Sequence, residues 1–337
     1  MLKKVSLLTL VLFVAMSVSA FAGDLMKMVP EDAAFIFSIN LQKIMTTEAV
    51  KKAIDEGMAK QTPEQKKAYE EFIQKTGIDP MKHVSELLVI MPAKSGQKTG
   101  KPEAAVIVNG AFDKAKILET LKTDKDASKE MTIEKFEGFD SFKSKKEDDA
   151  TGVFIDNNTV LLGNTPVVKS VIDVKNGKAK DISNNASFKA LLAKVDTTAS
   201  IWGAGVIPQT MKDQAKANPQ AASLANVNTI SFSLNYDKEI AFNFMGEVDK
   251  KENMDQVMTS LNGFLAMVKM IGGQNPQAAE VLNMIKLEAD GTTAKISMKV
   301  TAEKIEEIKK KIQDQIKQGA AGAPGAAPAP APAVEPK

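Results

Sequence analysis

Few side chains of this sequence are suited to metal or nucleophilic chemistry. The chain of 337 residues contains a single histidine, His83, and no cysteine. Zinc sites need several Cys or His ligands, and a nucleophilic serine needs a nearby base that is usually a histidine. We therefore predict no metal site, no cofactor and no catalytic residue, and a structural or surface position for His83.

Three further patterns contain polar residues or glycines, but each is weak evidence for a functional site. Residues 124–130 (Asp-Lys-Asp-Ala-Ser-Lys-Glu) alternate like calcium ligands but lack the glycine and the distal glutamate of a helix–loop–helix site, so we expect a solvated loop. Gly203-Ala-Gly205 lacks the third glycine of a dinucleotide fingerprint and predicts a close-packed strand end. Glu147-Asp148-Asp149 predicts a charged connection, although two carboxylates distant in sequence could still act together as a hydrolase.

The most apolar candidate for binding is a long helix that follows Asp249. Apolar residues recur there at helical spacing, and the apolar face is wider than a minimal stripe. Such a helix packs on the core or, because methionine adapts to varied apolar partners, presents a face for a hydrophobic ligand or a partner helix. The candidate face comprises Met254, Met258, Leu261, Phe264, Leu265, Met267, Val268 and Ile271.

The charge pattern argues against nucleic-acid binding. All 44 basic residues are lysine, and they nearly balance 42 acidic residues. Arginine is the preferred fork for phosphates and base edges, and a protein that binds nucleic acid usually carries excess positive charge. We therefore expect an unknown envelope protein or a hydrophobic ligand as the partner, and no nucleic acid.

The first 22 residues have the pattern of a signal peptide. Lys3 and Lys4 precede an apolar stretch, Leu7 to Val18, and Ala20-Phe-Ala22 supplies the small residues of a cleavage site before Gly23. No second apolar run reaches the roughly 18 residues that a membrane span requires. We therefore predict an exported protein without a transmembrane segment after cleavage, in the periplasm or, as the alternative, secreted.

Short strands and helices alternate along the rest of the chain, with hairpins in both halves. Strand patterns at 34–39, 87–91 and 104–108 are joined by polar loops and helical patterns, and Asp290-Gly291 is a strong hairpin turn. Hairpins imply mainly antiparallel sheets. We therefore expect an α+β fold in which helices pack on one face of the sheets.

Related residues in the two halves suggest an internal duplication. Gly110-x-Phe-Asp-Lys ends a strand and opens a helix, as does Gly246-x-Val-Asp-Lys, and Thr165 follows Gly110 at the distance at which Thr301 follows Gly246. We predict two similar halves, each with its own mainly antiparallel sheet. The predicted segments are a signal peptide (1–22), the first half (23–182), the second half (183–318) and a disordered Ala/Pro-rich tail (319–337).

The chain resembles a group of uncharacterised exported bacterial envelope proteins of the kind described as domains of unknown function. The resemblance is carried by Val29-Pro-Glu-Asp32, Gly77-Ile-Asp-Pro80, the segment 152–168 with Leu161-Leu-Gly163, and Asn185-Ala-Ser-Phe188. It implies a duplicated α+β envelope protein and provides no catalytic residues.

These observations leave three functional hypotheses. The first is a soluble exported protein that binds or scaffolds a component of the bacterial envelope without catalysis. The second is a carrier of a hydrophobic ligand or lipid that uses the Met-rich helix at 254–271. The third is a hydrolase that uses paired carboxylates.

Overall fold

The structure is a computed structural model, and it describes residues 25–93, 103–146, 149–218, 221–236, 239–273, 276–301, 303–308 and 310–311. The predicted signal peptide and the predicted tail lie outside these residues, as do Glu147 and Asp148. Within the described part of the chain, no helix is both long enough and apolar enough to cross a lipid bilayer.

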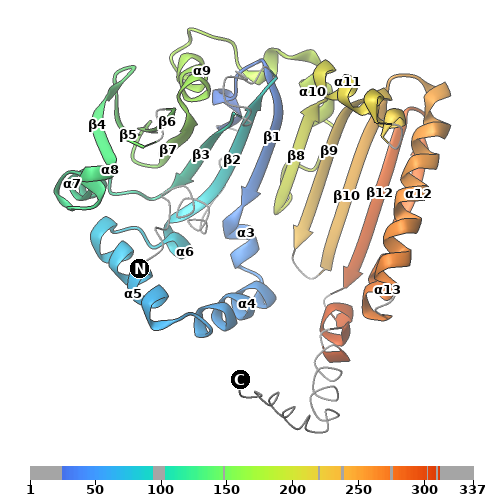
Figure 1. The fold of residues 1–337 in the computed structure, drawn as a ribbon, viewed down its shortest axis with the longest axis horizontal. Helices are drawn as coiled ribbons and strands as arrows, with labels where there is room; N and C mark the ends of the chain where they lie inside the picture. The colour runs from blue at the N-terminus through green and yellow to red at the C-terminus, as the bar shows by residue number, and fades with distance from the viewer. Residues whose placement is uncertain are drawn as a thin grey trace, which may run out of the picture.

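One antiparallel sheet of twelve strands forms the centre of the fold (Figure 1). Its spatial order is β11-β12-β10-β9-β8-β1-β2-β3-β7-β6-β5-β4. The strands are β1 (Ala33–Asn40), β2 (Val84–Pro92), β3 (Ala105–Gly110), β4 (Met131–Phe136), β5 (Phe139–Ser144), β6 (Ala150–Phe154), β7 (Thr159–Asn164), β8 (Ile201–Val206), β9 (Val227–Tyr236), β10 (Glu239–Val248), β11 (Lys286–Asp290) and β12 (Thr293–Thr301).

Helices connect the strands and begin and end at recognisable signals. Thr62 forms a capping box with Gln65 at the start of α5, and Gly77 ends that helix in the left-handed conformation that glycine adopts easily. The α-helices are α3 (Leu41–Met45), α4 (Glu48–Ala59), α5 (Pro63–Thr76), α6 (Pro80–His83), α7 (Lys114–Thr123), α8 (Ala127–Glu130), α9 (Thr165–Lys175), α10 (Ala186–Leu192), α11 (Gln209–Ala217), α12 (Met254–Gly272) and α13 (Pro276–Leu282). Short 3-10 helices are η1 (Met26–Met28), η2 (Ile182–Asn184), η3 (Ala222–Asn226) and η4 (Lys251–Asn253).

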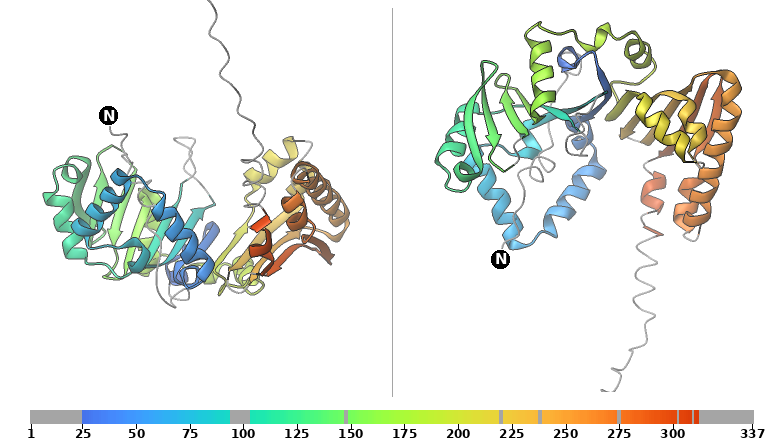
Figure 2. Two further views of the ribbon diagram at one scale, coloured as in Figure 1. Left: turned by 90° about the horizontal axis from the view of Figure 1, so that it is seen from below. Right: turned by 45° about the horizontal axis from the view of Figure 1, so that its top comes forward.

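The predicted α+β class with hairpin-built antiparallel strands is confirmed, but the expectation of a separate sheet in each half is wrong. Strands β1 and β8 pair with each other, with Phe37 opposite Gly203, and this pairing joins all the strands into one sheet. Each of these two strands would otherwise present an unpaired row of backbone amide and carbonyl groups. The first and last strands of the sheet lie far apart as a result (Figures 1 and 2).

One face of the sheet, which we call the helix-covered face, carries the main core. Its buried side chains include Ile36, Leu88, Ile107, Leu161 and Trp202. They pack with residues of η1, α9, η2 and α10, such as Val168, Ile172 and Phe188. This core reaches across the pairing of β1 and β8, because Trp202 and Ala204 of β8 belong to the same cluster. The helix-covered face therefore holds the centre of the sheet together.

The opposite face carries an apolar row that crosses every strand. Residues directly opposite one another in adjacent strands lie on the same face of a sheet. Following the pairs from edge to edge gives Ile133, Phe142, Gly152, Leu162, Val106, Val89, Phe37, Gly203, Phe232, Phe244, Ile296 and Leu287. The ten side chains other than glycine in this row are all half-buried.

Helices also cover this second face at its two ends, so the expectation that helices pack on only one face is wrong. On the first-half strands, Ile117, Leu118 and Leu121 of α7 pack with Val106 and Leu162 of the row, together with residues of α3 such as Leu41. On the other end, Met254 and Val257 of α12 form a small core with Val248 and Ala294. The strands between these two clusters carry the candidate site.

Candidate functional site

Five half-buried phenylalanines lie on the second face between the clusters under α7 and α12. They are Phe35 and Phe37 of β1, Phe232 of β9, and Phe242 and Phe244 of β10, and we call this part of the sheet the aromatic face. None of the five belongs to a buried cluster in the described part of the chain. Their apolar neighbours on the same face are Val89, Met91, Leu234, Ile296 and Met298.

Strand β9 shows how unusual this burial pattern is. Ser231 and Ser233 are buried on the helix-covered face, whereas Phe232 and Leu234 on the aromatic face are only half-buried. The Ser231 hydroxyl has no hydrogen-bond partner among the described residues. A strand that served only the core would bury its rings and expose its hydroxyls, because burying an unpaired hydroxyl is unfavourable. The pattern therefore places apolar surface where solvent or a partner reaches it.

Two glycines of β8 allow the aromatic rings to lie close against the sheet. A Cβ atom at Gly203 would lie 2.4 Å from the ring of Phe232, and one at Gly205 would lie 1.9 Å from the ring of Phe35. Phe232 also contacts Phe37, with ring centroids 5.8 Å apart. Glycine in a strand interior is unfavourable unless another group approaches closely. The predicted close-packed role of Gly203 and Gly205 thus has a specific partner, the aromatic rings, although the pair lies within β8 and not at its end.

The candidate residues of α12 differ in solvent exposure along the helix. Met254 is 4% exposed, Met258 and Leu261 are half-buried against the small core, and Leu265 and Val268 are half-buried further along. By contrast, Phe264 is 61%, Met267 46% and Ile271 64% exposed, and the adjacent Met270 is 71% exposed. We call the last four residues the exposed flank of α12. The helix thus packs on the small core through one side of its first half, and one flank of its second half presents apolar side chains to solvent.

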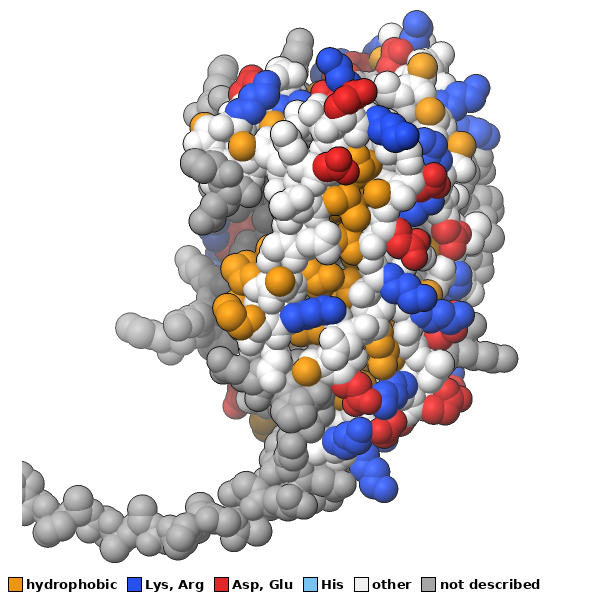
Figure 3. Space-filling model, turned by 90° about the vertical axis from the view of Figure 1, so that its right-hand side faces the viewer, with side chains coloured by type: hydrophobic (Ala, Val, Ile, Leu, Met, Phe, Trp, Pro, Cys, Tyr) orange, Lys and Arg blue, Asp and Glu red, His pale blue; other side chains and the backbone are white. Residues whose placement is uncertain are grey.

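The 3-10 helix η3 lies beside α12 on the side that carries most of the exposed flank. The hydroxyls of Ser223 in η3 and Ser260 in α12 lie 2.6 Å apart. Ser260 shares a side of the helix with Phe264, Met267 and Ile271, so η3 contacts α12 on this side. Figure 3 views the molecule from the α12 side and shows apolar side chains gathered in the middle of this surface, with charged side chains around them.

Two pockets of the described residues lie outside the aromatic face. One, of about 290 Å³, is lined by residues of α4 and α5, including Asp55, Lys66 and Tyr69. The other, of about 380 Å³, is lined by Ser223 and four polar residues of α12. Both are lined largely by polar side chains. The candidate site is therefore a surface and not one of these pockets.

The only histidine has a local structural contact. The Nδ1 atom of His83 accepts a hydrogen bond from the backbone N–H of Asp79, at 3.0 Å, across the short helix α6. The Asp79 carboxylate accepts a hydrogen bond from the Tyr69 hydroxyl at 2.9 Å. Burial, followed by this contact with Asp79, raises the pKa of Tyr69. The Tyr69–Asp79 contact connects α5 to α6. Among the described residues, no serine hydroxyl forms a hydrogen bond with the His83 imidazole.

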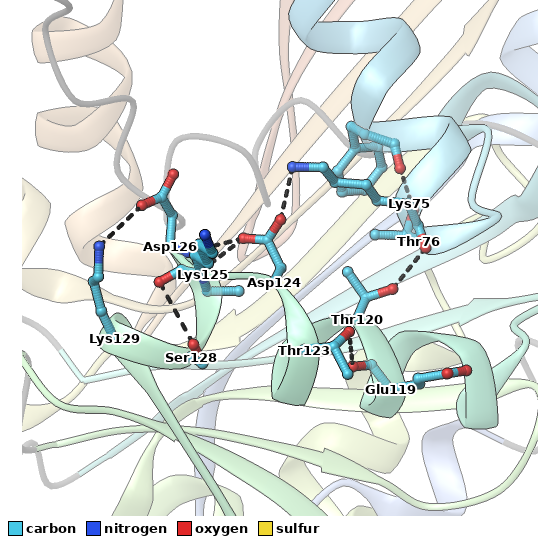
Figure 4. A network of polar contacts seen from close by, with 12 residues as sticks. Lys75, Thr76, Glu119, Thr120, Thr123, Asp124, Lys125, Asp126, Ser128 and Lys129 are labelled. Carbon is cyan, nitrogen blue, oxygen red and sulfur yellow. Dashed lines mark hydrogen bonds and ion pairs between the residues drawn. The ribbon is translucent and has the colours of Figure 1, made fainter.

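The calcium-like segment after α7 is held by its own chain and by a lysine (Figure 4). Asp124 pairs with Lys75 of α5 at 2.7 Å and accepts hydrogen bonds from the backbone N–H groups of Asp126 and Ala127. The Lys75 ammonium, more than any other group, lowers the pKa of Asp124 to about 2. Thr120 of α7 also donates to the Lys75 carbonyl oxygen, at 2.6 Å. These contacts join α5 to α7, and no cluster of three or more acidic or histidine residues suited to a metal occurs within the described ranges.

The structure contains a buried carboxylate that the sequence alone did not identify. Glu86 of β2 is 5% exposed on the helix-covered face, and its Oε1 atom accepts a hydrogen bond from the Ser38 hydroxyl at 2.7 Å. Burial raises the pKa of Glu86, and the contact with Ser38 opposes this shift in part. The sequence offered one signal, a glutamate inside the apolar strand from Val84 to Met91.

Comparisons of the chain with family models, with curated proteins and with solved structures gave no match. The functional argument therefore rests on this chain's own residues. The residues that sequence reasoning missed are the aromatic face of β1, β9 and β10. Their signal is the recurrence of phenylalanine at every second position in Phe35-x-Phe37 and Phe242-x-Phe244, which places both rings of each pair on one face of a strand.

Proposed function

We propose that this protein is an exported, non-enzymatic binding protein of the bacterial envelope that holds an apolar ligand or partner segment on its aromatic face. The observation that carries the proposal is the position of five phenylalanines, half-buried and outside the core clusters, on the face of the sheet on which α12 packs with its exposed apolar flank. Apolar surface gathered in one place is characteristic of interaction sites, whereas single exposed apolar residues are ordinary.

The signal-peptide pattern of residues 1–22 supports the export part of the proposal. Outside the cytoplasm, apolar ligands and partner segments occur at membranes and in envelope assemblies. A carrier of a hydrophobic ligand or lipid is the second form of the same proposal, and it is favoured by the methionines Met267 and Met270 of α12. The hydrolase hypothesis stays a prediction. Glu86, the most buried carboxylate among the described residues, accepts a hydrogen bond from a serine hydroxyl.

We further propose that the chain arose by duplication of one half, with the boundary near residue 182. The strand order supports this proposal. Outward from the central pair, the sheet reads β1-β2-β3-β7-β6 on one side and β8-β9-β10-β12-β11 on the other. Gly110 ends β3 and Gly246 lies near the end of β10, the third strand on each side, and each is followed by a helix. On this view β4, β5, α4 and α5 are additions to the first half.

Binding of Nile red, a small apolar fluorophore, tests the binding function. The chain from Gly23 to Lys337 is titrated with the dye, and the fluorescence increase gives the affinity. We expect saturable binding, and we expect Phe244→Ser and Phe264→Ser each to weaken it about tenfold, which corresponds to about 1.4 kcal/mol. Met211→Ser is the matched control, because Met211 is 46% exposed on α11 and belongs neither to the aromatic face nor to the exposed flank of α12.

Circular dichroism and urea unfolding show whether each variant is folded. Dye binding that is unchanged in both phenylalanine variants, or lost equally in the Met211 control, contradicts the proposal.

A further inference from the structure

The exposed flank of α12 is an apolar surface whose size can be compared with that of a dimer interface. Its residues Phe264, Met267, Met270 and Ile271 are 61%, 46%, 71% and 64% exposed. A large apolar side chain offers about 150 to 250 Å² when it is fully exposed, so the four together expose roughly 400 to 600 Å². Two such surfaces in contact would bury about 1,000 Å² in total, which is the lower limit for a specific interface between proteins.

The residues on this side of α12 form two rows along the helix. With 3.6 residues per turn, residues seven positions apart lie in one row, two turns from each other. Phe264 and Ile271 form the first row, and Gly263 and Met270 form the second. Met267 lies between the two rows. The surface thus has one row of two large side chains and one row in which a large side chain follows an empty position.

A two-fold axis at Met267 makes these two rows complementary to a second copy of themselves. In an antiparallel pair of symmetry-related helices, the early residue of a row in one copy faces the late residue of the same row in the other, and the reverse. Phe264 of each protomer then faces Ile271 of its partner, and Gly263 faces Met270. Met267 faces Met267 at the centre. In the second row, the missing side chain of glycine provides the space that the methionine of the other copy fills.

Gly263 has a role in this pair that it does not have within one copy of the chain. It is exposed in the middle of α12, and a Cβ atom there would have no described atom within 4 Å. An exposed glycine inside a helix reduces stability by about 1 kcal/mol relative to alanine. Close approach of another helix is a physical reason for this residue, and the approaching side chain is Met270, whose flexible thioether adapts to the space.

The charges of the chain do not oppose such a contact. Asp255 and Lys269, the two charged residues of α12, lie on other sides of the helix than Met267. Removal of Lys3 and Lys4 with the predicted signal peptide leaves 42 lysines and 42 acidic residues. Since the formal net charge of that chain is zero, two copies experience no net long-range repulsion.

We infer that the protein forms a symmetric dimer in which the exposed flanks of two α12 helices pack antiparallel about Met267. The inference goes beyond the proposed function, because it assigns the flank to a second copy of the chain and leaves the aromatic face to the ligand. Permanent homodimers commonly bury about 2,000 Å² or more, so this smaller contact should dissociate on dilution through the micromolar range. Dissociated protomers present the flank and the aromatic face together.

Sedimentation velocity across the micromolar range, on the chain from Gly23 to Lys337, tests the inference. We expect a reversible equilibrium between monomer and dimer. Met267→Asp and Met267→Lys should each weaken the dimer at least tenfold, because the two-fold axis places two like charges against each other. An equimolar mixture of the two variants should restore the dimer, because opposite charges then meet. Met267 is 46% exposed, so both variants should fold, and circular dichroism checks this.

A substitution at Gly263 separates this contact from general association of apolar surfaces. Gly263→Leu adds an apolar side chain to the flank but fills the space that Met270 occupies, so we expect the dimer to weaken at least tenfold. Association that depended only on apolar area would become stronger. Met211→Asp is the control: Met211 is 46% exposed on α11, outside the flank, and its replacement should leave the dimer unchanged.

The outcomes that contradict the inference are distinct. A wild-type chain that stays monomeric overturns it, as does a dimer that Met267→Asp leaves intact or a mixture of folded Asp and Lys variants that stays monomeric. Flotation of a monomeric chain with phosphatidylcholine vesicles, abolished by Met267→Asp, assigns the flank to a lipid surface and also overturns it. A monomeric wild type that binds Nile red overturns the dimer and leaves the proposed function intact. A dimer that binds no dye contradicts the proposed function alone.

Discussion

The two faces of the twelve-stranded sheet are both apolar near its centre, but they are used differently. The helix-covered face buries Ile36, Leu88 and Leu161 to 2% exposure or less, under α9 and α10. On the aromatic face, Phe37, Phe232 and Phe244 in the same strands or their neighbours remain half-buried. Apolar content is thus similar, and what differs is whether a helix of this chain covers it. The comparison indicates that one face provides stability and the other is available for binding.

The largest expected effect separates the two faces by their contribution to stability. Leu161→Ala removes a side chain with no exposed surface, so we expect the free energy of unfolding to fall by about 3 kcal/mol. Leu234→Ala, the matched change on the half-buried aromatic face, should reduce it by about 1 kcal/mol. Urea unfolding followed by circular dichroism measures both. Equal losses would show that the aromatic face is ordinary core, and the comparison between the faces would fail.

Two glycine substitutions test whether close packing against β8 fixes the position of the aromatic rings. In Gly203→Ala the new Cβ atom would lie 2.4 Å from the Phe232 ring, so the ring must move, and we expect a loss of about 2 kcal/mol with weaker Nile red binding. Gly263→Ala is the matched control, because it meets open space in a helix and should stabilise the chain by about 1 kcal/mol. If Gly203→Ala is neutral in both measurements, the rings do not depend on the glycine.

Much of this fold follows from local sequence patterns. The turn at Asp290-Gly291 and the strand alternation predicted hairpins, and the structure has them as β11–β12 and its other antiparallel pairs. The helical spacing after Asp249 predicted α12, although the structure starts it at Met254. Local patterns therefore identified the elements and placed their ends less well.

The arrangement of those elements depends on contacts between residues far apart in sequence. Pairing of β1 with β8 joins Phe37 to Gly203, and no local pattern specifies that partner. Alternation in Phe35-x-Phe37 shows that both rings share a face, but it does not show whether a helix covers that face. For α12 the spacing gave one apolar side, but it did not show that Phe264 and Met267 on that side are exposed. Whether a helix covers an apolar face is therefore decided by how the sheet and the helices pack in the complete fold.

The smallest expected effect concerns Glu86, a buried carboxylate that interrupts the apolar pattern of β2 on the helix-covered face. Burial raises the pKa of Glu86 above its ordinary value of 4.5, so the folded protein holds this proton at a pH where the unfolded chain has lost it. Stability is therefore greatest below the unfolded pKa and falls as the pH rises through the folded pKa. Glu86→Gln removes the charge and keeps the shape, so its contribution should not change with pH.

We expect Glu86→Gln to match the wild type near pH 4 and to exceed it by about 1 kcal/mol at pH 7, because the neutral amide avoids the unfavourable burial of a charge. Urea unfolding at a series of pH values between 4 and 8 measures the difference. Ser38→Ala is the companion variant: it removes the hydroxyl that donates to Glu86 at 2.7 Å, and it should steepen the fall in stability with pH. A difference between Glu86→Gln and the wild type that is constant over this range would show that the Glu86 carboxyl is solvated. The helix-covered face would then be open at β2, and the contrast with the aromatic face would be weaker than the burial of Leu88 indicates.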